Sequence, residues 1–329
     1  MRKIALLAAL GVSTLALALA QGKSPIIGLI TKTESNPFFV KMKEGASKEA
    51  ARLGAKFLSA AGKQDGDNAG QVAAIENFVA AGAQTILITP SDSKAIVPAI
   101  KKAQAAGVQV IALDSPTEPA DAVDALYATD NFKAGVLIGE YAAAQLKGKT
   151  LKIAMLDLFP GHPVGIARHN GFLAGLGANN IDADTEELAT TPQVVCSQDT
   201  FGDQAKGQTA MENCLQKNPD INVVYTINEP AAAGAFQALK AAKKTAAIFS
   251  VDGGCEGVRN VDKNVIVATS QQYPLKMAAL GVAAGVKYAK TGVKAKGYVD
   301  TGVTLIAKRA LVGIGSKNVA FGLANCWGN

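Results

Sequence analysis

The feature that most constrains the fold is a regular alternation of short apolar runs with Ala-rich amphipathic stretches. The apolar runs are nearly continuous in Val, Ile and Leu, as in parallel strands buried on both faces. Several amphipathic stretches end in Gly directly before the next apolar run, which is the usual signal for the end of a helix. We expect strands at 26–30, 85–89, 108–113, 125–128, 152–158, 223–227, 248–251 and 265–270, and helices at 38–53, 71–81, 94–106, 132–145, 165–176, 204–216, 231–242 and 273–291.

The alternation covers the chain twice, once over 26–128 and again over 132–270. A helix and two short strands follow (298–301 and 303–307), and the Gly-rich tail 308–329 is expected to be an extended strap rather than a helix. One sheet of this size would be unusual. The sequence therefore predicts an α/β fold with two doubly wound parallel-sheet lobes, and segments after 270 can return to the first lobe.

The first twenty residues have the three parts of a secretory signal peptide. Arg2 and Lys3 are charged, the run 4–20 is apolar, and Ala18 and Ala20 form an A-x-A cleavage site. The alternative is a single transmembrane anchor, but the apolar run is at or below the usual spanning length of about 20 residues. We expect residues 1–20 to be removed and the protein to be periplasmic or secreted.

The charge pattern argues against a nucleic-acid partner. The net charge of +6 comes from 33 basic and 27 acidic residues that are spread along the chain. No basic stripe with interleaved aromatic residues is present, and such a stripe is the usual mark of a nucleic-acid surface.

The cysteines indicate disulfides rather than a metal site. An even number of cysteines in an exported protein favours disulfide bonds. No pair has C-x-x-C spacing and the chain has two His, so neither a metal nor a cofactor is expected. The pairing cannot be read from the sequence alone. We favour Cys196–Cys214, because Cys214 lies on the helix after the Cys196 segment, and Cys255–Cys326, which would staple the tail to the body.

Two adjacent aromatic residues, Phe38 and Phe39, follow the predicted strand 26–30, although only 5% of the chain is aromatic. Asn36 suits a helix N-cap and Pro37 the first turn of a helix. The aromatic pair thus stands at a strand-to-helix turn, where open α/β sheets bind ligands. An aromatic face beside an amide suits a sugar, which has C–H faces and hydroxyls. The alternative is that both are core residues.

Polar side chains also follow several other predicted strands. Parallel strands bring their carboxyl ends to one edge of a sheet, so these side chains should converge. Carboxylates accept hydrogen bonds from paired hydroxyls, while guanidinium and amide groups donate, which suits a neutral polyol. The alternative for any one of them is a helix N-cap. The residues are Asp114, Asn228, Glu229, Asp252, Gln271 and Gln272.

Catalytic patterns are hard to build from this sequence, so an enzyme is not expected. It contains no G-x-S-x-G, G-x-x-x-x-G-K-[ST] or H-E-x-x-H motif. His169 beside Arg168 could act as a base but has no obvious nucleophile. Asp114 and Asp252 could imitate the acid pair of a glycosidase, yet nothing in the sequence suggests a raised carboxyl pKa. The segment 65–68 (Asp-Gly-Asp-Asn) lacks the later ligands of a calcium loop, and a turn with an N-cap is favoured.

A series of motifs along the chain carries a resemblance to a known family. They are Asn36-Pro37-Phe38-Phe39, Leu87-Ile88-Thr89-Pro90-Ser91-Asp92, Ala112-Leu113-Asp114, Thr129-Asp130-Asn131, Asn228-Glu229, Val251-Asp252-Gly253 and Ala268-Thr269-Ser270-Gln271-Gln272. In this order, over essentially all of the chain after the leader, they resemble the periplasmic sugar-binding proteins of the ribose-binding type, the substrate-binding components of bacterial ABC importers. The segments 224–234 and 250–255 look most like the fructose-binding subgroup.

The resemblance implies a type I periplasmic binding protein fold with a multi-strand hinge. The N-terminal lobe would comprise 25–129 and 273–300, and the C-terminal lobe 130–272 and 301–329. Phe38 and Phe39 would stack on the sugar. Its hydroxyls would be bound by Asn36, Asp114, Arg168, Asn228, Asp252 and Gln272.

Two departures from the family pattern stand out. Ribose binders carry Asp-Arg where this chain has Asp114-Ser115, which puts ribose in doubt. Phe201 is the nearest match to an aromatic residue of the second lobe, but its spacing is off.

The function implied by the resemblance is capture of a monosaccharide, with fructose favoured, by hinge closure. A monomer would then dock on a membrane ABC permease. A sugar sensor for chemotaxis or signalling is the nearest alternative. A LacI-type regulator would begin with a helix-turn-helix rather than an export signal. A secreted glycoside hydrolase is the enzyme alternative.

Overall fold

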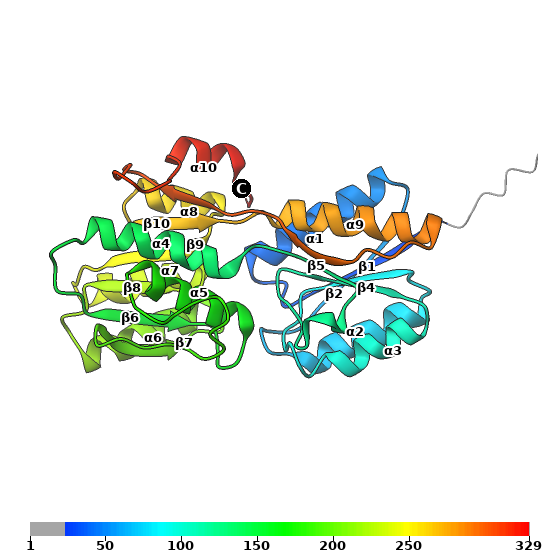
Figure 1. Cartoon of the computed structure of the whole chain (residues 1–329), viewed down its shortest axis with the longest axis horizontal. Helices are drawn as coiled ribbons and strands as arrows, with labels where there is room; N and C mark the ends of the chain where they lie inside the picture. Colours follow the sequence, from blue (N-terminus) through cyan, green and yellow to red (C-terminus); the bar gives the residue numbers. More distant parts are fainter. Residues whose placement is uncertain (1–23, 329) are drawn as a thin grey trace, which may run out of the picture.

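The computed structural model describes residues 24–328 and contains two six-stranded sheets, each in its own lobe (Figure 1). The leader predicted at 1–20 lies outside the described residues. The strands of the first sheet are β1 (Ile26–Thr31), β2 (Lys56–Ala61), β3 (Thr85–Ile88), β4 (Gln109–Leu113), β5 (Ala125–Ala128) and β11 (Gly297–Asp300). They are all parallel, in the order β11-β5-β4-β3-β1-β2. We call this sheet and its helices the N-terminal lobe.

The second sheet repeats this plan. Its strands are β6 (Ile153–Asp157), β7 (Val194–Asp199), β8 (Val223–Thr226), β9 (Ala247–Asp252), β10 (Ala268–Gln271) and β12 (Thr304–Ala307). Their order is β12-β10-β9-β8-β6-β7, and β12 alone is antiparallel to its neighbour. We call this sheet and its helices the C-terminal lobe. The prediction of an α/β fold with two parallel-sheet lobes is therefore confirmed.

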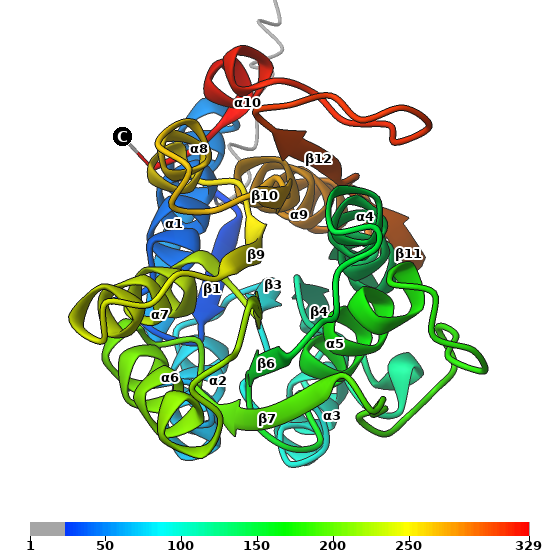
Figure 2. The ribbon, with the colours of Figure 1, turned by 90° about the vertical axis from the view of Figure 1, so that its left-hand side faces the viewer.

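Helices cover both faces of each sheet. In the N-terminal lobe, apolar side chains pack α1 (Pro37–Arg52) and α9 (Pro274–Thr291) on one face, and α2 (Asn68–Ala80) and α3 (Val97–Ala105) on the other. In the C-terminal lobe, α4 (Asn131–Gln145) and α5 (Pro163–Gly175) face α6 (Gln204–Lys217) and α7 (Glu229–Ala241) across the sheet (Figure 2). Three short helices complete the fold: a 3-10 helix at Ala120–Ala122, α8 (Cys255–Asp262) and α10 (Val319–Asn325).

The chain passes between the two sheets at three places. The first is between β5 and α4, the second between β10 and α9, and the third between β11 and β12. In Figure 1 these segments run through the middle of the molecule. All three connections are loops rather than helices.

The structure differs from the sequence predictions at the sheet edges and in the tail. Strands β2 and β7 were not predicted, because each is an edge strand with partly exposed side chains and lacks a continuous apolar run. The tail 308–329 was predicted to be extended, and this is wrong for α10. The side chain of Asn318 caps that helix by accepting a hydrogen bond from the backbone N–H of Phe321 at 2.9 Å.

Both favoured disulfides are present in the structure. Cys196 of β7 joins Cys214 of α6, and Cys255 at the start of α8 joins Cys326 just after α10. Their Cα–Cα distances of 5.6 and 4.9 Å are ordinary for a disulfide. Among residues 24–328, no helix has both the length and the apolar character that a membrane span needs.

Candidate functional site: a cleft between the lobes

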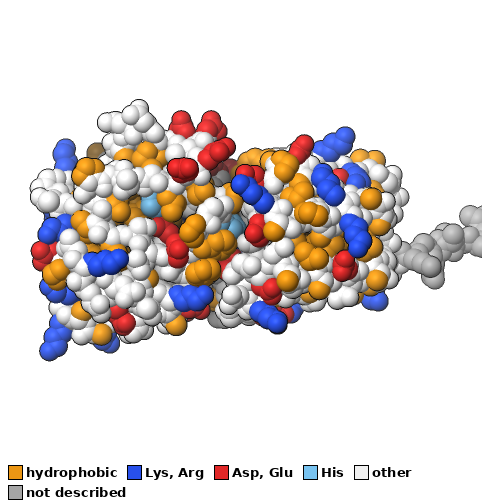
Figure 3. Space-filling view, turned by 90° about the horizontal axis from the view of Figure 1, so that it is seen from below, with side chains coloured by type: hydrophobic (Ala, Val, Ile, Leu, Met, Phe, Trp, Pro, Cys, Tyr) orange, Lys and Arg blue, Asp and Glu red, His pale blue; other side chains and the backbone are white. Residues whose placement is uncertain are grey.

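A cleft of about 730 Å³ opens between the two lobes. The N-terminal lobe lines it with residues from the loops after β1 and β2, including Asn36 and Asp65. The C-terminal lobe contributes residues around Phe201, the start of α7, and Asp252 at the end of β9. In Figure 3, acidic and basic side chains gather along the boundary between the lobes. The cleft therefore has the mixed polar walls that a polyhydroxyl ligand needs.

The N-terminal wall is built by the first turn of α1. Asn36 is the N-cap, as predicted, and its side-chain oxygen accepts from the backbone N–H of Phe38 at 3.0 Å. The rings of Phe38 and Phe39 are 3% and 4% exposed and lie edge to face with centroids 5.4 Å apart. Asn36 lines the cleft, whereas Phe38 and Phe39 do not line it and belong to the apolar core between the sheet and α1. The core alternative thus holds for both rings.

Asp252, Gln272 and Arg168 come together in the C-terminal lobe, and all three are buried. Gln272 donates from Nε2 to Oδ1 of Asp252 at 2.7 Å, and Nη1 of Arg168 lies 3.8 Å from the same oxygen. Oε1 of Gln272 is buried and accepts no hydrogen bond from residues 24–328. These predicted residues therefore form one polar group with unused hydrogen-bonding capacity, and Asp252 lines the cleft.

Burial raises the pKa of the Asp252 carboxyl from 3.8 to about 6. The charge of Arg168 and the hydrogen bond from Gln272 act in the opposite direction, while the charge of Asp114 raises the pKa further. The amino-acid sequence shows no sign of this raised pKa. The reason is that desolvation depends on the surrounding fold and not on the residues adjacent in sequence.

Arg168 is held by a close contact between two helices. A side chain at Gly135 or Gly139 of α4, or at Gly171 of α5, would overlap the backbone of the facing helix. This approach lets Arg168 donate from Nε to Oδ1 of Asn131 at 2.8 Å, and Nη1 donates to the carbonyl of Ile227 at 3.0 Å. A guanidinium has five N–H donors, so donors remain for a ligand.

Asp114 and Asp252 both end strands in a left-handed backbone conformation, with φ of 64° and 135°. Such backbone costs about 1–3 kcal/mol at a non-glycine residue and is found mostly at functional sites. Asp114 is buried and accepts from the hydroxyl of Ser115 at 2.9 Å. The prediction that Asp114 follows the end of a strand is correct, because this residue comes directly after β4.

Asn228 is used mainly as a helix cap. Its Oδ1 accepts from the backbone N–H of Ala231 at 3.0 Å, and its Nδ2 donates to the carbonyl of Gly202 at 3.0 Å. No hydrogen bond joins it to the Asp252 group among the described residues. The N-cap alternative therefore holds for Asn228, and one amide hydrogen is left for another partner.

The residues considered for catalysis or metal binding have structural partners. His169 lies 2.8 Å from Oδ1 of Asp157 through Nδ1 and 2.8 Å from the carbonyl of Ala189 through Nε2. Asp67 caps α2, as the turn-and-cap prediction for this segment requires. No group of three or more His, Cys, Asp or Glu side chains placed to hold a metal occurs within residues 24–328.

A buried charged group between the lobes was missed by the sequence analysis. Nζ of Lys32, just after β1, lies 3.0 Å from Nε2 of His162, which caps α5 in the other lobe. Asp65 lies 3.5 Å from the same Nζ and lines the cleft. Burial and the charge of Lys32 lower the pKa of His162 well below its usual value, so the imidazole is neutral. Like Asp114, Lys32 is a charged residue directly after a strand, so the same pattern could have identified it.

Phe201, whose spacing departs from that of the family's aromatic residue, lines the C-terminal side of the cleft. Its ring stacks on Phe159 with centroids 5.4 Å apart, and Nζ of Lys206 lies 4.0 Å from the ring centroid. Phe38 and Phe39 are not among the residues that line the cleft, so of the aromatic residues considered in the sequence analysis only Phe201 lines it.

These features define a two-lobed solute-binding protein, and comparison with known proteins gives its family. The model of the periplasmic binding protein domain matches residues 27–294. The ribose import binding protein of Bacillus subtilis is 36% identical over 248 residues, which is 75% of this chain and 76% of that protein. Its Escherichia coli counterpart is 30% identical over 311 residues, covering 94% and 99%. The chain therefore belongs to the periplasmic binding protein family, with the sugar-binding proteins of the ribose-binding type.

Solved structures agree with this assignment. A solute-binding protein of Mycobacterium smegmatis with bound glycerol has a TM-score of 0.78 at 28% identity, covering 87% of this chain and 94% of that one. A solute-binding protein of Actinobacillus succinogenes with bound D-allose has a TM-score of 0.73 at 27% identity, covering 85% and 97%. The family is one of non-enzymatic solute-binding proteins, as the sequence predicts.

Proposed function

We propose that this protein captures a monosaccharide in the cleft between its lobes and delivers it to an ABC-type membrane permease. The observation that carries the proposal is the convergence of Arg168, Asp252 and Gln272 beside a cleft. A carboxylate and a guanidinium fixed side by side can accept from one sugar hydroxyl and donate to its neighbour. The relatives whose names refer to ribose and D-allose support a sugar as the ligand.

The residues proposed to bind the sugar are those predicted from the sequence. Asp114 and Asp252 would accept from hydroxyls, and Arg168 would donate. Each hydrogen bond to a charged group contributes about 1.5–3 kcal/mol when buried. The full proposed set is Asn36, Phe38, Phe39, Asp114, Arg168, Asn228, Asp252 and Gln272.

The sugar is proposed to be a neutral pentose or hexose. Fructose is the sugar that the sequence favoured, but the relatives named here are ribose and D-allose binders and give it no support. Ser115 stands where ribose binders carry Arg, which weighs against ribose itself. Fructose, ribose and allose are therefore the first sugars to test.

Binding is proposed to act through hinge closure. We propose that residues 25–129 with 273–300 move as one lobe and 130–272 with 301–329 as the other. A sugar that contacts both lobes shifts the equilibrium toward the closed form by no more than its preference for that form. Contacts that cross the lobes, such as Lys32 with His162, would break on opening. Export through the leader, a monomeric state and docking of the closed form on the permease are parts of the same proposal.

Equilibrium dialysis of the mature chain against single radiolabelled monosaccharides tests this function. We expect one sugar, or a few related sugars, to be retained and recovered unchanged by chromatography. Retention of no monosaccharide would contradict the proposal. Chemical conversion of a bound sugar or a disaccharide would instead favour the glycoside hydrolase alternative.

A further inference from the structure

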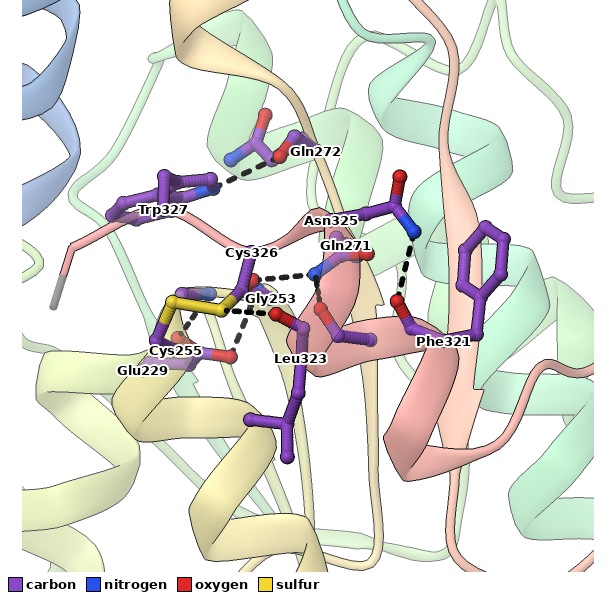
Figure 4. Close-up of a disulfide and its surroundings, with 12 residues drawn as sticks. Glu229, Gly253, Cys255, Gln271, Gln272, Phe321, Leu323, Asn325, Cys326 and Trp327 are labelled. Carbon is purple, nitrogen blue, oxygen red and sulfur yellow. Dashed lines mark hydrogen bonds between the residues drawn. A yellow bond between two sulfur atoms is a disulfide. The ribbon is translucent and has the colours of Figure 1, made fainter.

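The segment after α10 is fixed to the C-terminal lobe covalently and by hydrogen bonds, and Figure 4 shows its disulfide and the hydrogen bond from Trp327 to Gln272. The disulfide Cys255–Cys326 ties it covalently to the first turn of α8. The carbonyl of Trp327 accepts from the backbone N–H of Cys255 at 2.8 Å. A Cβ at Gly254 would lie 3.4 Å from the indole, so the ring packs directly on the start of α8. We call residues 326–328 the C-terminal strap.

The strap reaches two of the residues proposed to bind the sugar. The indole of Trp327 is 6% exposed and donates from Nε1 to the carbonyl of Gln272 at 2.9 Å. Its ring lies edge to face with Phe38, with centroids 5.4 Å apart and planes at 79°. Phe38 belongs to α1 of the N-terminal lobe, whereas Gln272 lies where the chain leaves the second sheet. One side chain therefore contacts a proposed ligand residue on each side of the cleft, and Trp327 itself lines that cleft.

We propose that Trp327 is a positioning residue of the binding site, held by the disulfide so that closure brings its ring against Phe38. This inference rests on the proposed function. Because the strap is bonded to the C-terminal lobe, opening of the lobes would separate the indole from Phe38. The contact thus favours the closed form, and the hydrogen bond to the Gln272 carbonyl fixes the backbone whose side chain binds Asp252. The ring also belongs to the apolar core around Phe38 and Phe39, so the contact joins the strap to the N-terminal lobe.

Trp327 is the only tryptophan of the chain, so its fluorescence reports on the strap alone. We expect the emission of the wild-type protein to change on titration with the sugar found by dialysis, and to follow saturation. Trp327→Ala should weaken sugar affinity about tenfold or more, because it removes both the aromatic pair and the hydrogen bond. Trp327→Phe keeps the aromatic contact with Phe38 and should lose less sugar affinity than Trp327→Ala. Phe321→Ala, on α10 and outside the cleft lining, is the matched control and should bind as the wild type does.

Cys326→Ser tests the role of the disulfide. It should shift the emission of Trp327 toward that of a solvent-exposed indole. It should also weaken sugar binding by a factor between those of the wild type and Trp327→Ala. Melting temperatures measured without sugar show whether a variant has lost its fold rather than its binding. The fluorescence titration of the wild type tests the inference without any variant. The inference is overturned if the emission ignores the sugar and Trp327→Ala binds as tightly as the wild type. If the wild type binds no monosaccharide, the proposed function fails and this inference falls with it.

Discussion

Replacing Asp252 by Asn should stabilise the sugar-free protein and weaken sugar binding. Asn has nearly the same shape, and its side-chain oxygen can still accept from Nε2 of Gln272, which lies 2.7 Å from Oδ1 in the wild type. The substitution removes the charge and replaces one carboxyl oxygen by an NH2 group. The two effects are opposite in sign because the ionised carboxyl is unfavourable in the folded protein but is the form that accepts hydrogen bonds from a sugar.

The magnitude follows from the pKa of Asp252, which burial raises from 3.8 to about 6. The difference corresponds to about 3 kcal/mol against the ionised form in the folded state. The attraction of Arg168 is already contained in this value. Well below pH 3.8 the carboxyl is protonated in both states, so the wild type and Asp252→Asn should be equally stable there. Between about pH 4 and 6 only the unfolded state releases the proton, so the wild type loses stability as the pH rises, and above about pH 6 the full difference is present.

Urea unfolding at pH 4 and pH 7.5 measures this difference. We expect the midpoint of Asp252→Asn to lie close to that of the wild type at pH 4 and to be higher at pH 7.5, by up to about 3 kcal/mol in the free energy of unfolding. Asp121→Asn, at an exposed position, is the control and should leave stability unchanged at both pH values. A variant that is less stable than the wild type at pH 7.5, or an equal difference at both pH values, would refute the reasoning.

Three further predictions follow from the same structure. Because Asp252 must be ionised to accept from sugar hydroxyls, calorimetry should show about tenfold weaker binding at pH 5 than at pH 7.5, and equal affinities would exclude that role. Gly135→Ala places a methyl group against the backbone of α5 and should lower the free energy of unfolding by about 1–3 kcal/mol. Gly315→Ala has open space and should change nothing in the same denaturant titration. Replacing both Cys196 and Cys214 by Ser opens a loop with a sequence separation of 18 and should cost about 3 kcal/mol, and an unchanged melting temperature would count against this.

The sequence predicted most of the architecture because buried parallel strands have a pattern that can be read locally. Central strands such as β1, β4 and β8 are apolar runs, and the polar residue after each run marks the carboxyl end of the strand. The edge strands β2 and β7 lack such runs, since one side of each is partly exposed. Their presence depends on pairing with β1 and β6, which the local sequence does not show.

The candidate site was predictable only in part. Asp114 and Asp252 had a strand-end signal, whereas Arg168 lies within a helix and was found through the family resemblance alone. The contact of Lys32 with His162 joins two lobes and spans 130 positions in the sequence. Trp327 is held at the cleft by the Cys255–Cys326 disulfide and by its position just after α10. The Gly-rich sequence of the tail did not suggest this helix. The raised pKa of Asp252 likewise depends on burial, which only the folded chain defines.

Thermal unfolding with a panel of monosaccharides is the most direct test of the account. The panel should include fructose, ribose, allose, xylose, glucose, galactose and mannose, each compared with buffer alone. A cognate sugar at hundredfold excess over its Kd should add about 2.7 kcal/mol to the free energy of unfolding, which raises the melting temperature by several degrees. A rise with one sugar or a few related sugars is the predicted result, and an unchanged melting temperature with every monosaccharide would contradict the account.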